Sequence, residues 1–178
     1  MNIAVYLGAN EGNDPALATA VQELGRWIGE SGNRLIYGGS KTGLMGLLAD
    51  SALGAEAEVI GVELEMFMDE DYQHTGLTEL IVKPDFSQRK TEIIRRSEAF
   101  IAFPGGTGTL EEISEVMSLS SLKLTKAPCI LYNLNGYYEP LRLQLQRMVE
   151  AGLSSPERQE GLHFASHLRE IQNILAEN

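Results

Sequence analysis

The amino-acid sequence predicts an α/β fold. We expect a single doubly wound, Rossmann-like domain over residues 1–178, with a mainly parallel sheet of about six or seven strands and helices on both faces. Short apolar runs alternate along the chain with segments whose apolar residues recur at helical spacing. This alternation is typical of β–α–β units with right-handed crossovers. The apolar runs are also nearly continuous, as strands are when helices cover both faces of a parallel sheet.

Each expected element follows from this periodicity, taken in chain order. Strands are expected at 3–9, 34–39, 58–64, 79–84, 99–104 and 128–133, where the apolar runs lie. The first helix is expected at 15–30, because Leu17, Val21, Leu24 and Ile28 recur every three or four residues. The other helices are expected at 43–53, 87–97, 109–124, 137–151 and about 165–176, with a loop and a short helix at 65–78.

The composition restricts the compartment and the partners. The formal net charge is −11, which argues against nucleic acid or an anionic membrane as partner, because both attract basic surfaces. Cys129 is the only cysteine, and its apolar surroundings indicate a buried strand residue. The histidines lack the spacing of a metal cluster, so no metal is expected. The chain begins directly with a predicted strand and has no long apolar segment, which favours the cytoplasm.

Ligands of such sheets bind beyond the carboxyl ends of the strands. Four segments are therefore candidates for a binding site, at 8–12, 38–43, 85–90 and 104–109. The last lies in "FIAFPGGTGTLEE" and holds three glycines beside two glutamates. Glycines let backbone N–H groups approach a ligand, and a helix that begins there favours an anion such as phosphate. A tight strand-to-helix turn explains the glycines as well. Neither G-x-x-x-x-G-K-[ST] nor G-x-G-x-x-G is present.

The charged residues beside these turns also have two interpretations. Thr109 and Glu112 fit the S/T-x-x-E capping box of a helix start, and this favours a structural role for Glu111 and Glu112 over a catalytic one. Arg89 and Lys90 lie at the start of a predicted helix, where positive charge opposes the helix dipole. An anion bound between them explains the pair, and two solvated side chains are the alternative.

The motifs together resemble one family. "PGGTGTLEE" resembles the P-G-G-x-G-T-x-x-E signature of the Lonely Guy family of cytokinin-activating phosphoribohydrolases, often labelled "lysine decarboxylase-like". "YGGSKTGLMG", "FSQRKTEI" and "LNGYYEPL" are similar to further segments of that family. The resemblance extends from the first strand to about residue 153 and implies a homodimer without cofactor. It also implies a reaction, in which the N-glycosidic bond of a nucleoside 5′-monophosphate is cleaved to free base and ribose 5-phosphate.

The resemblance also assigns roles to residues. Arg89 and Glu112 correspond to the family's catalytic arginine and glutamate. The substrate- and phosphate-binding positions correspond to Gly39, Ser40, Asp71, Lys90, Gly105, Gly106, Thr107, Gly108, Thr109 and Ser118. The chain departs from the family at several positions, among them Thr107, where tyrosine or phenylalanine is common. The base that is recognised therefore stays open.

Two other functions remain open beside hydrolysis. A nucleotide or molybdenum-cofactor carrier would use the same sheet edge without turnover. True lysine decarboxylation would need pyridoxal phosphate on a Schiff-base lysine, and no lysine of the chain has a recognisable context for it.

Overall fold

The structure, a computed structural model, describes residues 1–68 and 72–177. Its strands form one sheet of seven with the order β4–β3–β2–β1–β5–β6–β7, and every neighbouring pair is parallel. The strands are β1 (Asn2–Tyr6), β2 (Arg34–Tyr37), β3 (Val59–Leu64), β4 (Glu79–Lys83), β5 (Ala99–Ala102), β6 (Cys129–Tyr132) and β7 (Leu162–Ala165). The helices are α1 (Pro15–Glu30), α2 (Gly43–Gly54), α3 (Phe86–Arg96), α4 (Thr107–Ser121), α5 (Glu139–Glu150) and α6 (Leu168–Ala176). Short 3₁₀ helices lie at Glu65–Phe67, Leu134–Gly136 and Pro156–Arg158. The predicted doubly wound α/β fold is confirmed.

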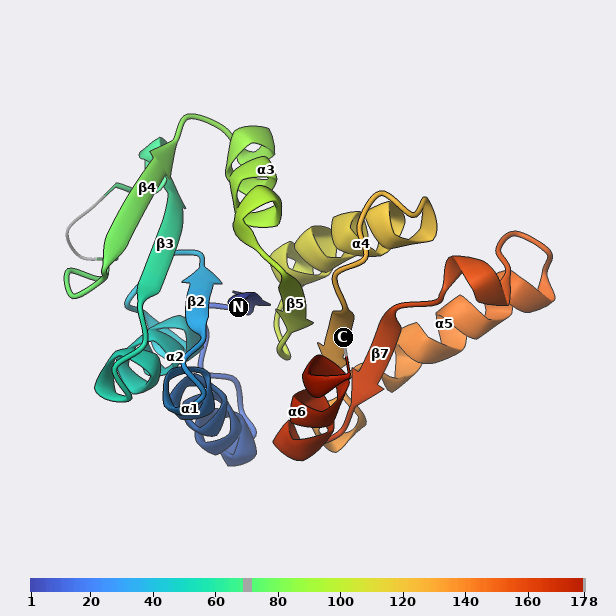
Figure 1. Ribbon diagram of the computed structural model, residues 1–178, viewed down its shortest axis with the longest axis horizontal. Coiled ribbons are helices and arrows are strands. Elements are labelled where there is room, and N and C mark those ends of the chain that lie inside the picture. Colours follow the sequence, from blue (N-terminus) through green and yellow to red (C-terminus); the bar gives the residue numbers. More distant parts are fainter. Residues whose placement is uncertain (69–71, 178) are drawn as a thin grey trace.

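Helices cover both faces of the sheet, and each face has its own apolar core (Figure 1). Because side chains alternate along a strand, Ile3 and Val5 of β1 enter the core shared with α1, α2 and α6. Ala4 and Tyr6 enter the core shared with α3 and α4. Cys129 is fully buried in the second core, which confirms its predicted place in a strand.

The order of the strands sets the position of the site. From β1 the chain proceeds outward through β2 and β3 to the edge strand β4, and then returns to place β5 on the other side of β1. The loops that follow β1 and β5 therefore diverge to opposite faces, toward α1 and α4. In open parallel sheets, this switch point is where a crevice for ligands forms.

Several element boundaries differ by a few residues from the sequence prediction, and two of the differences are informative. The chain forms a seventh strand at Leu162–Ala165, within a segment whose end had been assigned to the last helix. This strand lies at the sheet edge and is only partly buried, so it lacks the continuous apolar run of the central strands. Helix α4 begins at Thr107 rather than at residue 109, with Gly106 as its N-cap.

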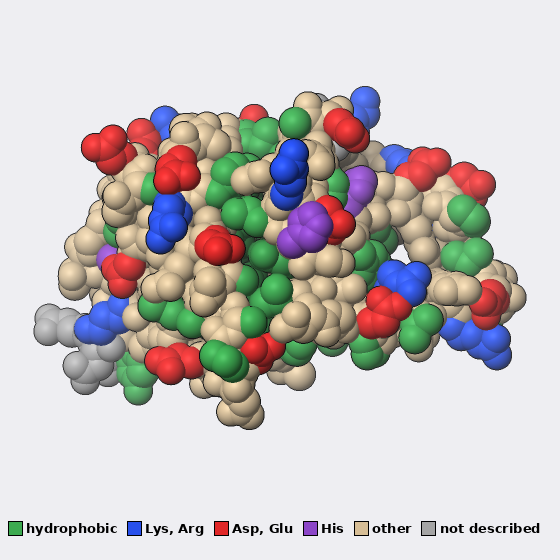
Figure 2. Space-filling view, turned by 90° about the horizontal axis from the view of Figure 1, so that it is seen from below, with side chains coloured by type: hydrophobic (Ala, Val, Ile, Leu, Met, Phe, Trp, Pro, Cys, Tyr) green, Lys and Arg blue, Asp and Glu red, His purple; other side chains and the backbone are tan. Residues whose placement is uncertain are grey.

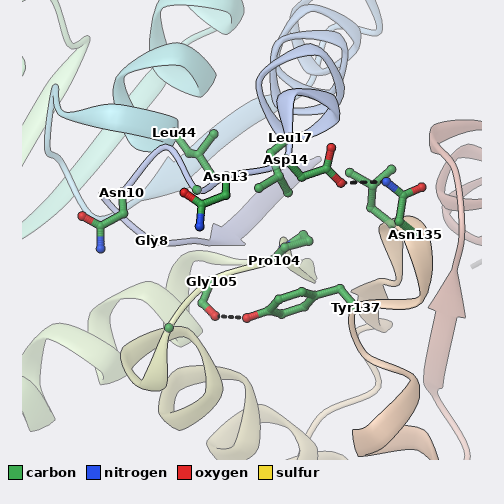
Figure 3. Close-up of a pocket in the computed structure, with 13 residues that line it drawn as sticks. Gly8, Asn10, Asn13, Asp14, Leu17, Leu44, Pro104, Gly105, Asn135 and Tyr137 are labelled. Carbon is green, nitrogen blue, oxygen red and sulfur yellow. Dashed lines mark hydrogen bonds between the residues drawn. The ribbon is translucent and has the colours of Figure 1, made fainter.

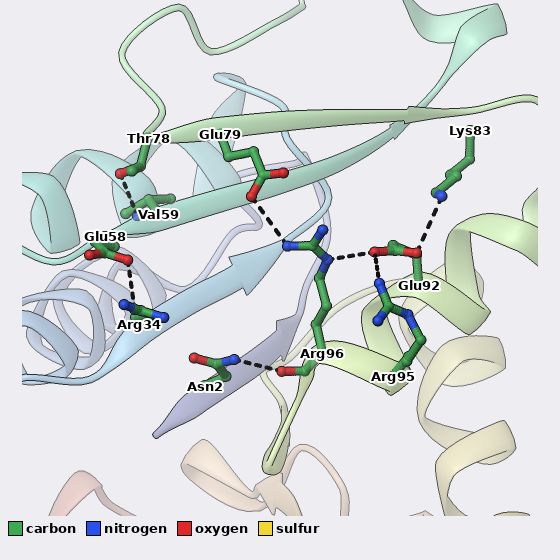
Figure 4. A network of polar contacts seen from close by, with 10 residues as sticks. All are labelled: Asn2, Arg34, Glu58, Val59, Thr78, Glu79, Lys83, Glu92, Arg95 and Arg96. Carbon is green, nitrogen blue, oxygen red and sulfur yellow. Dashed lines mark hydrogen bonds and ion pairs between the residues drawn. The ribbon is translucent and has the colours of Figure 1, made fainter.

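A network of ion pairs joins α3 to the edge of the sheet (Figure 4). Glu92 of α3 accepts hydrogen bonds from Arg96 at 2.5 Å and Arg95 at 2.7 Å, and lies 3.2 Å from Lys83 of β4. Arg96 also contacts Glu79 at 3.2 Å. Hydrogen bonds from these three cations lower the pKa of Glu92 to about 2. The network fastens the helix that carries Arg89 to the sheet.

The surface seen in Figure 2 carries acidic and basic side chains scattered among hydrophobic and polar ones. This mixture differs from the continuous basic surface that binds nucleic acid. Within residues 1–68 and 72–177, no helix combines the length and the apolar character needed to cross a bilayer.

Candidate active site

A cleft of about 860 Å³ lies across the carboxyl ends of the central strands. Its walls come from the segments after β1, β2, β3 and β5, together with α3 and α4. The lining residues are Leu7, Gly8, Ala9, Asn10, Gly38, Ser40, Thr42, Met45, Glu63, Phe67, Tyr72, Phe86, Arg89, Gly106, Thr107, Gly108, Thr109, Glu111 and Glu112. All four strand ends selected from the sequence therefore contribute to one cleft.

The first turn of α4 forms one wall of this cleft. Its N-cap is Gly106, and no side chain caps the helix start. The first backbone N–H groups of an α-helix have no intrahelical partner, and the helix dipole adds partial positive charge. The arrangement suits a phosphate, which such helix ends bind readily.

The three glycines of the turn are required for different reasons. A Cβ on Gly105 would lie 2.3 Å from the Thr109 hydroxyl oxygen and 3.0 Å from the backbone nitrogen of Gly8, so packing within the protein requires glycine there. A Cβ on Gly106 or Gly108 would meet no atom of residues 1–68 and 72–177 within 4 Å, apart from its chain neighbours and its own helix. The absence of side chains at Gly106 and Gly108 therefore leaves space in the cleft for a ligand.

The capping-box interpretation of Glu112 is wrong. Because α4 begins at Thr107, Thr109 lies inside the helix rather than at its N-cap, and Glu112 lies beyond the first turn. The carboxylate of Glu112 instead accepts a hydrogen bond from Arg89, with Nη1 and Oε1 2.6 Å apart. Each of the two side chains is 11% exposed. Burial raises the pKa of Glu112, and the Arg89 guanidinium opposes that rise.

Arg89 is held from both sides of the cleft. Its Nε donates to the backbone oxygen of Val62, near the end of β3, at 2.8 Å. Its Nη2 lies so close to Gly38 that a Cβ there would approach it to 2.8 Å. Arg89 lies near the start of α3, where its positive charge opposes the helix dipole. A strand carbonyl and the carboxylate of Glu112 on α4 stabilise it there.

Lys90 points to α4 and lies apart from Arg89. It forms ion pairs with Glu111 and, at 2.8 Å, with Glu115, and these carboxylates raise its pKa. Arg89 and Lys90 thus pair with different carboxylates of α4, and these pairs account for positive charge at the start of α3 without a bound anion. Lys90 is not among the described residues that line the cleft.

Of the remaining predicted site residues, some line the cleft and others lie outside it. Ser40 is buried, lines the cleft, and its hydroxyl lies 2.7 Å from that of Thr42. Gly39 has φ +93° and lies behind the cleft wall, where its backbone oxygen accepts from His74. Ser118 is exposed on α4 and donates to the backbone of Ser114 at 2.9 Å. Asp71 lies outside the described residues.

Several cleft residues were not singled out from the sequence. Glu63 is buried at the end of β3, and Met45, Phe67, Tyr72 and Phe86 supply apolar surface. A signal for Glu63 was present, because a carboxylate interrupts the apolar run "EVIGVEL" where the strand reaches its carboxyl end. Phe67 and Tyr72 lie in the connection between β3 and β4, and Phe86 begins α3, so only the fold brings them together.

A second chamber of about 400 Å³ adjoins the cleft and shares Gly8, Asn10 and Gly106 with it (Figure 3). Tyr137 donates to the backbone oxygen of Gly105 at 2.5 Å, and Asn135 donates to Asp14 at 2.8 Å. The "GYY" segment therefore supports the turn before α4 from behind.

No group of three or more His, Cys, Asp and Glu side chains within 1–68 and 72–177 is placed to hold a metal ion. The charged groups of the cleft are instead an Arg–Glu pair, a second buried carboxylate and Glu111.

The parallel sheet, the cleft at its switch point and the uncapped helix beside a buried Arg–Glu pair define a Rossmann-like α/β protein suited to a phosphorylated ligand. The chain belongs to the family described as "Possible lysine decarboxylase", whose model matches residues 45–175, and relatives named as phosphoribohydrolases confirm the resemblance found in the sequence.

Two relatives illustrate the similarity. A cytokinin riboside 5′-monophosphate phosphoribohydrolase of Rhodococcoides fascians is 41% identical over 156 residues, covering 87% of this chain and 79% of that protein. The enzyme of the same name, LOG7, of Arabidopsis thaliana is 34% identical over 175 residues, covering 98% of this chain and 81% of that protein.

Among solved structures, the molybdenum cofactor carrier protein of Chlamydomonas reinhardtii aligns with a TM-score of 0.70 over 98% of each chain. Its sequence identity to this chain is 22%, so the likeness shows a shared fold alone.

Proposed function

We propose that this protein hydrolyses the N-glycosidic bond of a nucleoside 5′-monophosphate, AMP or a cytokinin riboside 5′-monophosphate, to the free base and ribose 5-phosphate. One observation carries the proposal. The buried Arg89–Glu112 pair lines the same cleft as the uncapped start of α4, so a carboxylate and a phosphate site face one ligand. The names of the relatives support this substrate class.

The geometry suggests a role for each group. The N–H groups at the start of α4, with the hydroxyls of Thr107 and Thr109, hold the 5′-phosphate. As the C1′–N bond breaks, its electron pair leaves with the base and positive charge builds on the ribose. The Glu112 carboxylate stabilises that charge and accepts a proton from the water that adds to C1′. Arg89 orients this carboxylate and favours its ionised form.

The test is incubation of the pure protein with a panel of nucleoside monophosphates, with detection of ribose 5-phosphate and free base. Release of both products in equal amounts is expected for at least one purine nucleotide. A carrier would bind nucleotide, or the molybdenum cofactor, without producing ribose 5-phosphate, and that result would refute the proposal.

Lysine decarboxylation does not fit the cleft. The chemistry needs a lysine to hold pyridoxal phosphate as a Schiff base, and no lysine is among the described residues of the lining. An absorbance scan of the purified protein tests this directly.

We further propose that the protein forms a homodimer through α4 and the segment after it. Leu110, Leu122 and Leu124 are 43%, 58% and 69% exposed there. On α2, Leu44, Leu48, Ala49 and Ala52 are buried within the chain, and Met45, Leu47 and Leu53 are partly buried, so this helix offers less exposed apolar surface than α4 and the segment after it. Light scattering that gives a concentration-independent mass near 19.5 kDa would exclude the dimer. The cytoplasmic location stays a prediction.

A further inference from the structure

Glu63 is a buried carboxylate whose role is not explained by the ion pairs of the cleft. It lies at the end of β3, lines the cleft and is 8% exposed. Its Oε1 accepts from the backbone nitrogen of Leu64 at 2.9 Å. None of the described residues donates a hydrogen bond to Oε2, and no described lysine or arginine forms an ion pair with this side chain. One oxygen is thus fixed while the other is available to a ligand.

Such an arrangement is costly for a residue with a purely structural role. Burying an ionised carboxylate without a paired cation is strongly unfavourable, and an apolar side chain would pack there without that cost. Among the described residues, the cation that faces Glu63 is Arg89, which is already bound to Glu112 and to the backbone of Val62. Cleft residues that sacrifice stability in this way are often functional.

The surroundings of Glu63 favour its protonated form. Burial raises its pKa most, the Leu64 N–H and Arg89 oppose the rise, and the nearby Glu112 adds to it. Of the other titratable groups within the described part of the chain, the buried hydroxyl of Tyr37 also faces it, and Glu63 helps to raise the pKa of that hydroxyl. Two carboxylates in one cleft, only one of them paired with arginine, are a common basis for dividing acid and base roles.

The position along the sheet edge also distinguishes the two carboxylates. The phosphate site follows β5, and β1 and β2 separate β5 from β3. Three strand spacings correspond to about 14 Å. The Glu63 side chain narrows this gap, because Arg89, which is bound to Glu112, also faces it. A nucleotide with its phosphate at the start of α4 and its ribose beside Glu112 would extend its base toward the end of β3. Phe67, Tyr72 and Phe86 line the same cleft and offer flat apolar surface to a base.

We propose that Glu63 is the general acid of the reaction, donating its proton to a ring nitrogen of the departing base. The inference rests on the proposed hydrolysis and adds the group that activates the leaving group. When the C1′–N bond breaks, its electron pair stays on the base, which takes the proton from the Glu63 carboxyl. Water adds to C1′ and loses a proton to Glu112. Proton exchange with solvent then restores Glu63 as acid and Glu112 as base, so atoms and charges balance.

The test compares two leaving groups. AMP is the substrate whose base benefits from protonation, and p-nitrophenyl riboside 5′-phosphate is the substrate whose leaving group departs as a stable anion. Glu63→Gln keeps the size of the side chain but cannot donate a proton as an acid. It is expected to lower kcat on AMP by on the order of 10² or more, the usual contribution of a general acid, and to change kcat on the nitrophenyl substrate only a few-fold. The matched control is Glu65→Gln, at an exposed glutamate two residues away.

Three further outcomes are decisive. Wild-type kcat on AMP for Glu63→Gln would overturn the proposal, and so would an equal loss on both substrates, which indicates a structural role. If wild-type protein releases ribose 5-phosphate from neither substrate, the proposed hydrolysis itself fails, a result distinct from either of these.

A measurement on the wild-type protein makes the test independent of how the variant folds. An acid must be protonated to act, so kcat on AMP is expected to fall as pH rises through the pKa of Glu63, whereas kcat on the nitrophenyl substrate should lack this decline. Identical pH profiles for the two substrates would overturn the proposal.

Discussion

Replacing Glu112 by glutamine separates the charge of this residue from its shape. Glutamine keeps the side-chain length and one hydrogen bond to Arg89 but removes the negative charge beside the ribose. A unit charge about 4 Å away in a medium of effective dielectric about 20 contributes about 4 kcal/mol, which corresponds to about 10³ in rate. Because Arg89 lies 2.6 Å from the carboxylate, it offsets part of that field, and we expect kcat to fall by about 10² to 10³.

The same change also affects stability. Arg89 would stay buried without its counter-ion, and the loss of one partner of a buried pair costs about 3–5 kcal/mol when no hydrogen bond remains. Since the glutamine amide oxygen can still accept from Arg89, we expect a smaller loss of about 1–3 kcal/mol. The assay must therefore follow ribose 5-phosphate release well below the Tm, with AMP binding and far-UV circular dichroism measured on the same sample.

The matched control is Glu115→Gln on the same helix. Glu115 binds Lys90 and does not line the cleft, and Lys90 keeps Glu111 as a partner, so little change in kcat is expected. Glu111 itself lines the cleft and is unsuitable as a control. A folded Glu112→Gln variant that hydrolyses AMP at the wild-type rate would refute the catalytic assignment.

Four other predictions follow from named contacts. Arg89→Ala should lower kcat/KM for AMP by on the order of 10² or more and reduce the Tm, because a buried carboxylate loses its cation, and unchanged values of both would contradict this. Adenosine should be hydrolysed with a kcat/KM on the order of 10² or more below that of AMP, since the start of α4 would lack its anion, and equal values would exclude a phosphate site there. Gly108→Ala should raise the Tm, because alanine favours a helix, and should also raise KM for AMP, because its Cβ would enter only the cleft. Gly105→Ala should lower the Tm, because its Cβ would lie 2.3 Å from the Thr109 hydroxyl oxygen. Thermal melts that show the reverse order would contradict this description of the turn. Glu92, whose pKa is lowered from 4.5 to about 2, should add stability above pH about 4.5 that is lost as pH falls toward 2. The shift corresponds to about 3 kcal/mol, which solvent screening reduces to about 2 kcal/mol, and urea titrations of Glu92→Gln should lack this pH dependence.

The sequence by itself determined the class of fold and the edge of the sheet where ligands bind. Alternating apolar runs and helical periodicities depend on short-range spacing, which can be read without coordinates. The four strand ends follow from the same pattern, because parallel strands bring all their carboxyl ends to one edge. The signature at 104–112, together with the segment around Arg89, indicated the family, and relatives over most of the chain confirmed it.

The boundaries that sequence reasoning misplaced share a physical cause. Strand β7 lies at the sheet edge, where partial burial allows polar residues such as His163, so its pattern is weak. The start of α4 was misplaced because a capping box is a local preference. In the structure, Thr109 packs against Gly105 inside the helix, and Gly106 is the N-cap.

Only the tertiary structure decided which charged side chains pair with one another. Glu112 is 23 residues from Arg89 in the chain, and their hydrogen bond exists because β5 returns beside β1 and places α3 next to α4. The same arrangement directs Lys90 to other carboxylates and brings Glu63 into the cleft with Arg89 and Glu112. Pairing between distant side chains depends on strand order and helix placement, which local periodicity does not encode, so the roles of these carboxylates follow from the fold.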